Sequence, residues 1–133
     1  MTVAFWCLLV VLAAPYILSG AARSEGKRGE HAQDPRAYSE SLTGWHRRAH
    51  LAHLNAFEAI PALVAAVMVA EFSHAPRVYI DAIAVAFVVF RALHAIFYLA
   101  DRPKLRGRAF RLSLICIIGL FVVAAVFGRA SAT

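Results

Sequence analysis

Four long apolar segments alternate with polar connections along the chain. The first covers residues 2–22, carries no charged side chain, and is followed by Arg23. The other three cover residues 46–70, 78–100 and 109–127. A helix needs about 20 predominantly apolar residues to cross a bilayer, and each segment is close to that length. The pattern predicts an all-α membrane protein, a four-transmembrane-helix bundle that forms a single domain over residues 1–133.

The first segment has some features of a signal peptide, because Ser19-Gly20-Ala21 is an acceptable cleavage site. However, no basic residue precedes it, and its apolar run is longer than is usual in such peptides. We expect it to be a retained first helix.

Short-range signals predict what lies between the spans. Asp34 followed by Pro35 is typical of a helix start, with Asp as the cap and Pro at the first helical position, so a short helical turn is expected there. The second helix should begin near Thr43 or Gly44, shortly before its apolar span. A tight connection that contains Pro76 should follow it, and a turn over residues 101–108 should precede the fourth span.

Composition agrees with a membrane location. The chain is 61% apolar, whereas soluble domains contain about 45–50% apolar residues. A core formed by 133 residues is too small to bury that excess. The net charge of +6 would be compatible with nucleic-acid binding in a soluble protein. Here the basic residues crowd into two connections, so we expect a lipid bilayer as the partner and no nucleic acid.

Lys and Arg are distributed unequally among the three connections. The second connection holds only Arg77. The first holds Arg23, Lys27, Arg28, Arg36, Arg47 and Arg48, and the third holds Arg102, Lys104, Arg106 and Arg108. By the positive-inside rule, the first and third connections are cytoplasmic and both termini lie outside. The Ala- and Arg-rich composition favours a bacterial inner membrane.

Ionisable side chains well inside the spans lie essentially in the second and third segments. At about 100° per residue, Asn55 and Glu58 form a polar pair on one face of the second helix. Arg91, His94 and Tyr98 share a face of the third. Glu58 and Arg91 each lie about 15 Å from the cytoplasmic end of their helix. Because an unpaired charge in hydrocarbon is costly, we predict a buried Glu58–Arg91 salt bridge.

Two interpretations of this ion pair remain open. It could be a fixed link that sets the register of two helices and takes part in no chemistry. Alternatively, together with Asn55, His94 and Tyr98, it could form a polar path to the basic cytoplasmic rim. Such a path suits a pocket for a polar, anionic ligand. A channel or transporter is disfavoured because the four spans show no inverted repeat and no broken helix pair.

Other chemistry-bearing residues are interpreted as structural. His46, His50 and His53 share another face of the second helix, but no acidic or Cys ligand joins them, so we expect no metal site. Asp81 should pair with Arg77 or cap its helix. The two cysteines, Cys7 and Cys116, lie inside apolar segments and should behave as small buried hydrophobic residues.

Two motifs carry a resemblance to a known family. The second span reads R-A-x-x-A-H-x-N-x-x-E-x-x-P from Arg48 to Pro61, and the third contains Arg91-x-x-His94-x-x-x-Tyr98-Leu99. In this order and spacing they resemble the MAPEG family, the membrane-associated proteins in eicosanoid and glutathione metabolism. The second motif is similar to the prostaglandin E synthase branch in particular.

The resemblance implies a homotrimer that takes glutathione as co-substrate in a cytoplasm-facing cleft between subunits. Asn55 and Glu58 would hold the glutathione backbone, with Glu58 near the γ-glutamyl amine and His53 close by. Arg91 and His94 would support the peptide carboxylates.

The catalytic candidates that the resemblance implies are Tyr98, near the thiol, and Arg106, as the arginine that stabilises the thiolate. The spacing from Tyr98 to Arg106 is one residue shorter than in the prostaglandin branch. A larger departure is Leu51, which stands where several catalytic members have an arginine. Arg48 or Arg47 could substitute for it as a carboxylate ligand.

The function expected from these residues is addition of a glutathione thiolate to a lipophilic electrophile or hydroperoxide. The guanidinium of Arg106 would favour the thiolate, and the protein would position both partners. The alternative, favoured by Leu51, is a non-catalytic membrane protein of the same fold that binds a ligand or acts as a scaffold.

Overall fold

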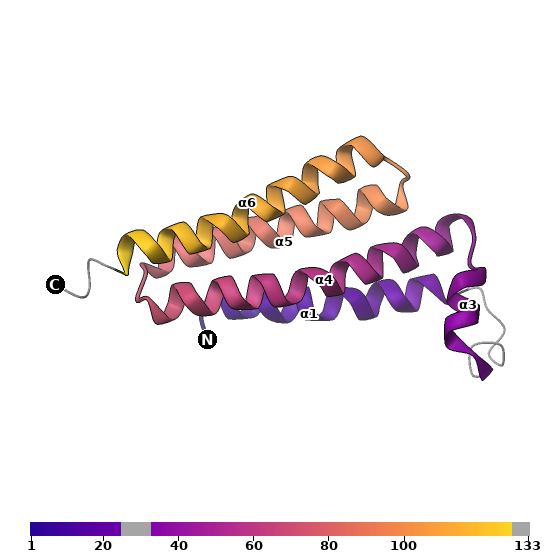
Figure 1. Cartoon of the computed structure of the whole chain (residues 1–133), viewed down its shortest axis with the longest axis horizontal. Coiled ribbons are helices and arrows are strands. Elements are labelled where there is room, and N and C mark those ends of the chain that lie inside the picture. The colour runs from indigo at the N-terminus through magenta and orange to yellow at the C-terminus, as the bar shows by residue number, and fades with distance from the viewer. Residues whose placement is uncertain (25–32, 129–133) are drawn as a thin grey trace.

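The computed structural model describes residues 1–24 and 33–128, and four long helices dominate this part of the chain (Figure 1). The helices are α1 (Val3–Ala22), α3 (Pro35–Ser41), α4 (Gly44–Phe72), α5 (Arg77–Leu99) and α6 (Pro103–Phe127). All except the short α3 are long and apolar enough to cross a membrane. The predicted all-α bundle of four membrane-spanning helices is therefore confirmed.

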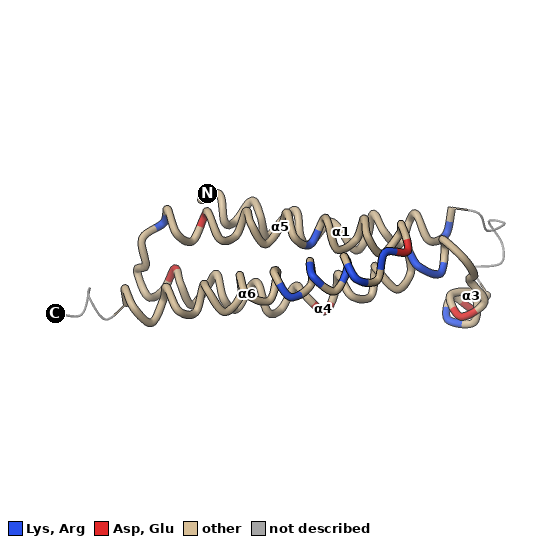
Figure 2. Tube along the Cα trace, turned by 90° about the horizontal axis from the view of Figure 1, so that it is seen from above, with Lys and Arg blue, Asp and Glu red and all other residues tan. Residues whose placement is uncertain are grey.

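The long helices form two packed pairs. α1 packs on α4 and α5 packs on α6, and the pairs meet mainly through the contacts of α4 with α5 and α6 and of α1 with α5. Figure 1 shows that α1 begins and α6 ends at one end of the bundle, whereas α3 and the α5–α6 turn lie at the other. Lys and Arg gather toward this second end, as Figure 2 shows. We call it the basic end.

Small side chains let the helices approach closely. Ala4, Ala66 and Ala84 are fully buried between them, beside larger core residues such as Phe87 and Leu63. Small residues at helix contacts are typical of membrane bundles, where close packing replaces the hydrophobic effect as the main attraction between helices.

The outward faces of the helices are apolar as well. Ile17 is 70% exposed and Ile115 is 60% exposed. Faces of this kind suit contact with lipid chains or with another apolar surface. The two cysteines, Cys7 and Cys116, are free and buried, as predicted.

The short-range signals in the first connection locate a helix correctly. The side chain of Asp34 accepts hydrogen bonds from the backbone N–H groups of Arg36 and Ala37, and Pro35 opens α3 as predicted. α4 begins at Gly44, as expected from its sequence. Part of the first connection, residues 25–32 with Lys27 and Arg28, lies outside the described residues.

The start of the fourth helix was predicted wrongly. α6 begins at Pro103, so most of the predicted turn over residues 101–108 is helical. Pro is favourable at the first helical position, and the Lys, Leu and Arg residues that follow it are good helix formers. The reversal is confined to a few residues around Asp101, whose φ of 54° lies in the left-handed region that Asp tolerates. As a result, the first turns of α6 lie beside the last turns of α5.

At the end opposite to the basic end, Asp81 on α5 caps α1. Its Oδ1 accepts a hydrogen bond of 2.7 Å from the backbone N–H of Ala4. Among the described residues, Asp81 neither forms the expected ion pair with Arg77 nor caps its own helix. The first N–H groups of α1 have no partner within their own helix. A carboxylate is a favourable acceptor for them, because a helix N-terminus attracts negative charge.

Candidate functional site

Arg91 forms the polar link between the two central helices. Its Nη2 donates two hydrogen bonds to Asn55 on α4, one of 2.7 Å to the backbone oxygen and one of 2.8 Å to Oδ1. Hydrogen bonds from a charged donor are stronger than those between neutral groups. The pair therefore fixes α5 against α4 in the middle of the bundle.

The predicted Glu58–Arg91 salt bridge is wrong. No ion pair joins these two side chains in the described structure, and Asn55 accepts the hydrogen bonds of the guanidinium instead. Glu58 is exposed on α4, whereas Asn55 lies at the contact with α5. Its charge still attracts Arg91 electrostatically, but without direct contact.

Asn55, Glu58 and Arg91 nevertheless share one cavity. This α6-side cavity has a volume of about 180 Å³ and is lined by residues of α4, α5 and α6, including Phe87 and Ser113. The structure thus brings together the polar pair of the second span and the arginine of the third. Ser113 was not predicted from the sequence, because a single Ser in an apolar span does not indicate a site. Its hydroxyl donates a hydrogen bond to the backbone oxygen of Phe110 in the same helix.

A second group of predicted residues meets at the basic end. The guanidinium carbon of Arg106 lies 4.2 Å from the centroid of the Tyr98 ring, which is a cation–π contact. The Nδ1 of His94 lies 3.1 Å from the backbone oxygen of Arg106. A carbonyl only accepts, so Nδ1 carries the proton and donates. Both contacts exist because the tight reversal after α5 brings the first turn of α6 back onto it.

Arg48 reaches the same end of α5. Its Nε donates a hydrogen bond of 3.1 Å to the backbone oxygen of Leu99, one of the carbonyls that the end of a helix leaves without an intrahelical partner. Arg48 is therefore held at the end of α5, and its two Nη groups are not used in this bond. The basic end thus collects Arg48, Tyr98 and Arg106 from three helices.

His53 faces another direction. Its Nδ1 lies 2.8 Å from the backbone oxygen of Pro15, so the imidazole donates to α1. Its ring also contacts the rings of His50 and Phe57. These contacts place the His53 ring against α1, whereas Asn55 and Glu58 line the α6-side cavity. A contact of His53 with a ligand stays a prediction.

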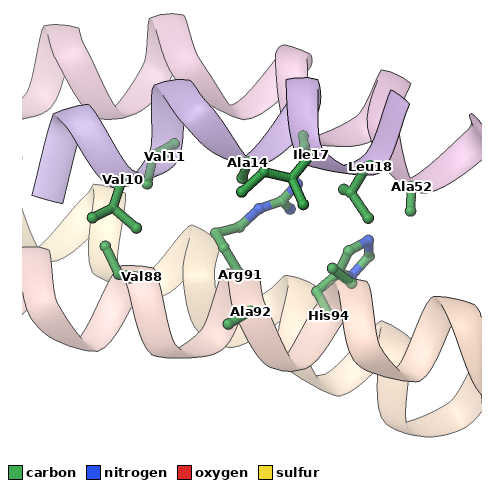
Figure 3. A pocket seen from close by; sticks show the side chains of 12 residues that line it. Val10, Val11, Ala14, Ile17, Leu18, Ala52, Val88, Arg91, Ala92 and His94 are labelled. Atoms are coloured by element: carbon green, nitrogen blue, oxygen red, sulfur yellow. The ribbon is translucent and has the colours of Figure 1, made fainter. Parts of the chain in front are cut away.

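His94 and Arg91 also line a second cavity, which lies on the α1 side of α5. This α1-side cavity has a volume of about 180 Å³ and lies between α1, α4 and α5, with Ala14 and Leu18 of α1 in its wall (Figure 3). His94 is only 4% exposed. Its Nε2 is buried and has no hydrogen-bond partner among the described residues. Nothing in the sequence indicated this cavity, because α1 contributes only apolar side chains to it.

The fold and the polar groups define a class of protein. It is a helical membrane protein of four spans, whose two central spans carry interlinked polar residues that continue to a basic end. The sequence profile of the MAPEG family matches residues 3–126 of the 133, and the chain belongs to this family of membrane-associated proteins in eicosanoid and glutathione metabolism. The predicted resemblance is thereby confirmed. Comparisons with curated proteins and with solved structures found no match.

Proposed function

We propose that this protein is a glutathione-dependent transferase or peroxidase that acts on a lipophilic electrophile or hydroperoxide. The observation that carries the proposal is the guanidinium of Arg106, held 4.2 Å from the Tyr98 ring at the basic end. Membership of the MAPEG family supports glutathione as the source of the thiol.

The chemistry requires a thiolate beside a cation. A free cysteine thiol has a pKa of about 8.5, so at neutral pH a nearby guanidinium increases the reactive fraction. In transfer, the thiolate attacks the electrophilic carbon, a C–S bond forms, and the leaving group departs with the bonding electrons. In peroxide reduction, two glutathione molecules supply two electrons, and the hydroperoxide becomes an alcohol and water while glutathione disulfide forms. The protein contributes position and charge stabilisation in both reactions.

The α6-side cavity would receive the peptide part of glutathione. Glu58 carries a carboxylate suited to the γ-glutamyl amine, while Arg91 and Asn55 present a cation and an amide. The Nδ1 of His94 donates to the backbone oxygen of Arg106, so the support of the carboxylates that was expected from His94 would come from Arg91. Tyr98 and Arg106 would then lie near the thiol.

The exposure of Glu58 supports a site completed by a second subunit. An ionised carboxylate on the outer face of a span is costly in lipid, and no cation pairs with it within residues 1–24 and 33–128. A ligand amine or a neighbouring copy would remove this cost. We propose a homotrimer with the cleft between subunits. The basic end would face the cytoplasm and both termini would lie outside, in a bacterial inner membrane.

Leu51 leaves the proposed site without one expected cation. Arg48 is the better substitute, because its bond to Leu99 fixes it at the end of α5 and uses only Nε. Its Nη groups could then bind a carboxylate of glutathione. Arg47 is the other candidate from the sequence, one position earlier on α4.

A non-catalytic binding or scaffold protein is the second candidate function. The observation that favours it is the pair of hydrogen bonds from Arg91 to Asn55. These bonds link two helices without a ligand. Interhelical hydrogen bonds of this kind often serve packing alone.

Conjugation of glutathione to 1-chloro-2,4-dinitrobenzene by the protein in lipid nanodiscs tests the proposal. We expect activity in the wild type and a loss of at least about 100-fold in Arg106→Ala, since removing one positioned charge stabiliser typically has an effect of this size. Arg108→Ala is the matched control, because it removes an exposed cation two residues further along α6 and should keep most activity. Both variants should unfold at nearly the wild-type temperature.

A second measurement decides between the two functions. Glutathione should produce thiolate absorbance and raise the thermal stability of the wild type. If neither effect occurs and no conjugate forms, the enzyme assignment fails and the scaffold function replaces it. Loss of the trimer in Arg106→Ala would contradict the role given to Arg106.

A further inference from the structure

The α1-side cavity is apolar apart from two side chains. Of the 12 residues that line it, ten are Ala, Val, Leu or Ile, and the other two are Arg91 and His94 of α5. Figure 3 shows both polar side chains extending from α5 toward α1. The cavity is therefore a hydrocarbon-lined space with one small polar spot, which is a common form for a small-molecule site.

His94, which lines this space, carries an unused acceptor. Its Nδ1 donates to the backbone oxygen of Arg106, and burying a charged ring among apolar side chains is costly, so the ring is taken as neutral. A neutral imidazole with its proton on Nδ1 has a lone pair on Nε2. That atom is buried without a partner in the described part of the chain, although buried polar atoms are almost always hydrogen-bonded.

Arg91 adds donors beside this acceptor. Only its Nη2 is used in the two bonds to Asn55, and the side chain lines the α1-side cavity as well as the α6-side cavity. A group that satisfies both residues must donate one hydrogen bond and accept another. A hydroxyl does so, whereas a carboxylate would place a second lone pair against Nε2 of His94.

The size and mouth of the cavity fit a slender molecule from the bilayer. A dry cavity of about 150 Å³ can hold benzene, so the volume of about 180 Å³ admits a hydroxyl end and several carbons. Val10 and Ile17, which line the cavity, are 54% and 70% exposed, so the space opens along the outer surface of α1. A longer chain could leave at this opening and continue in lipid.

We propose that the α1-side cavity binds a membrane-soluble aliphatic alcohol, whose hydroxyl donates to Nε2 of His94 and accepts from Arg91. The hydrocarbon chain of the alcohol packs against Ala14 and Val88. This site does not rest on the proposed function, because Ala14 lines the α1-side cavity alone. Alcohol binding can therefore be tested without glutathione, although both cavities are lined by Arg91.

Photolabelling tests this site without any assay of activity. The probe is octan-1-ol with a diazirine at its seventh carbon, applied to the wild-type protein in lipid nanodiscs, with labelled residues mapped by peptide mass spectrometry. We expect labels on the α1 and α5 residues of the cavity. Unlabelled octan-1-ol should compete about tenfold better than octyl methyl ether, which accepts a hydrogen bond but has none to donate. Equal competition, better competition by octanoate, or labels spread over all lipid-facing helix surfaces would each overturn the proposal.

Two pairs of variants locate the bound alcohol. Ala14→Leu should fill the cavity and reduce labelling at least tenfold, whereas Ala13→Leu adds the same side chain at the neighbouring exposed position and should leave labelling unchanged. His94→Leu should weaken competition by octan-1-ol about tenfold, and His94→Gln, which retains an acceptor, should restore most of it. If His94→Leu does not fold, the alanine pair and the alcohol–ether comparison still decide. Labelling that is equal in the two alanine variants would refute the location.

Discussion

The link between Arg91 and Asn55 yields a stability prediction that the expected salt bridge would not. Asn55→Ala removes the 2.8 Å bond to Oδ1 but leaves the 2.7 Å bond to the backbone oxygen. Interhelical hydrogen bonds in membrane proteins contribute about 0.6 kcal/mol on average and up to about 1.7 kcal/mol. A charged donor places this bond near the upper end of that range. We expect Asn55→Ala to lower the free energy of unfolding by about 1–2 kcal/mol.

Glu58→Gln is the matched control on the same helix. It removes a charge without changing shape, and because Glu58 makes no ion pair with Arg91, we expect any loss of stability to stay below about 0.5 kcal/mol. Reversible unfolding in mixed micelles, followed by circular dichroism, measures both variants. A larger loss in Glu58→Gln than in Asn55→Ala would refute the reasoning and restore the salt bridge that the sequence predicted.

Further predictions concern the contacts of α1. Asp81→Ala should lower the free energy of unfolding by about 1 kcal/mol, because the N–H of Ala4 loses its cap, while Asp81→Asn retains an acceptor oxygen and should lose less. Thermal unfolding of the two variants checks this, and equal losses would contradict the capping role. His53→Phe should cost about 1 kcal/mol through loss of the bond to the Pro15 carbonyl, measured against His50→Phe as the control. An equal effect in both would show that ring packing matters and the hydrogen bond does not.

The spans and the start of α3 were predictable because their signals are local. The tendency of a segment to enter a bilayer is a sum over its own residues. The cap of α3 likewise depends only on Asp34 and the residues directly after it. The start of α6 was missed because the charged residues after Pro103 were assigned to the connection between the spans. Charged residues after Pro103 favour a helix as strongly as apolar ones, and they need only lie near water.

The partner of Arg91 was missed for a different reason. Counting residues from the end of a span gives the depth of a side chain in the bilayer, and at that level Glu58 and Arg91 match. It does not give the rotation of each helix about its axis, which packing determines. That rotation turns Asn55 toward α5 and leaves Glu58 on the exposed side. The α1-side cavity was unpredictable for the same reason, since Ala14 and Leu18 are indistinguishable in sequence from residues that face lipid.

The position of Arg91 ties the two cavities together. Asn55 holds one nitrogen of its guanidinium, and the same side chain lines the α6-side cavity with Glu58 and the α1-side cavity with His94. An anion bound in the first cavity would attract the guanidinium and weaken its contact with a hydroxyl in the second. Two ligands that share one cation should therefore bind with negative coupling, and by linkage each should lower the affinity of the other by the same factor. Octan-1-ol titrated at rising glutathione concentration would show this reciprocity, and an affinity independent of glutathione would mean that Arg91 serves only one cavity.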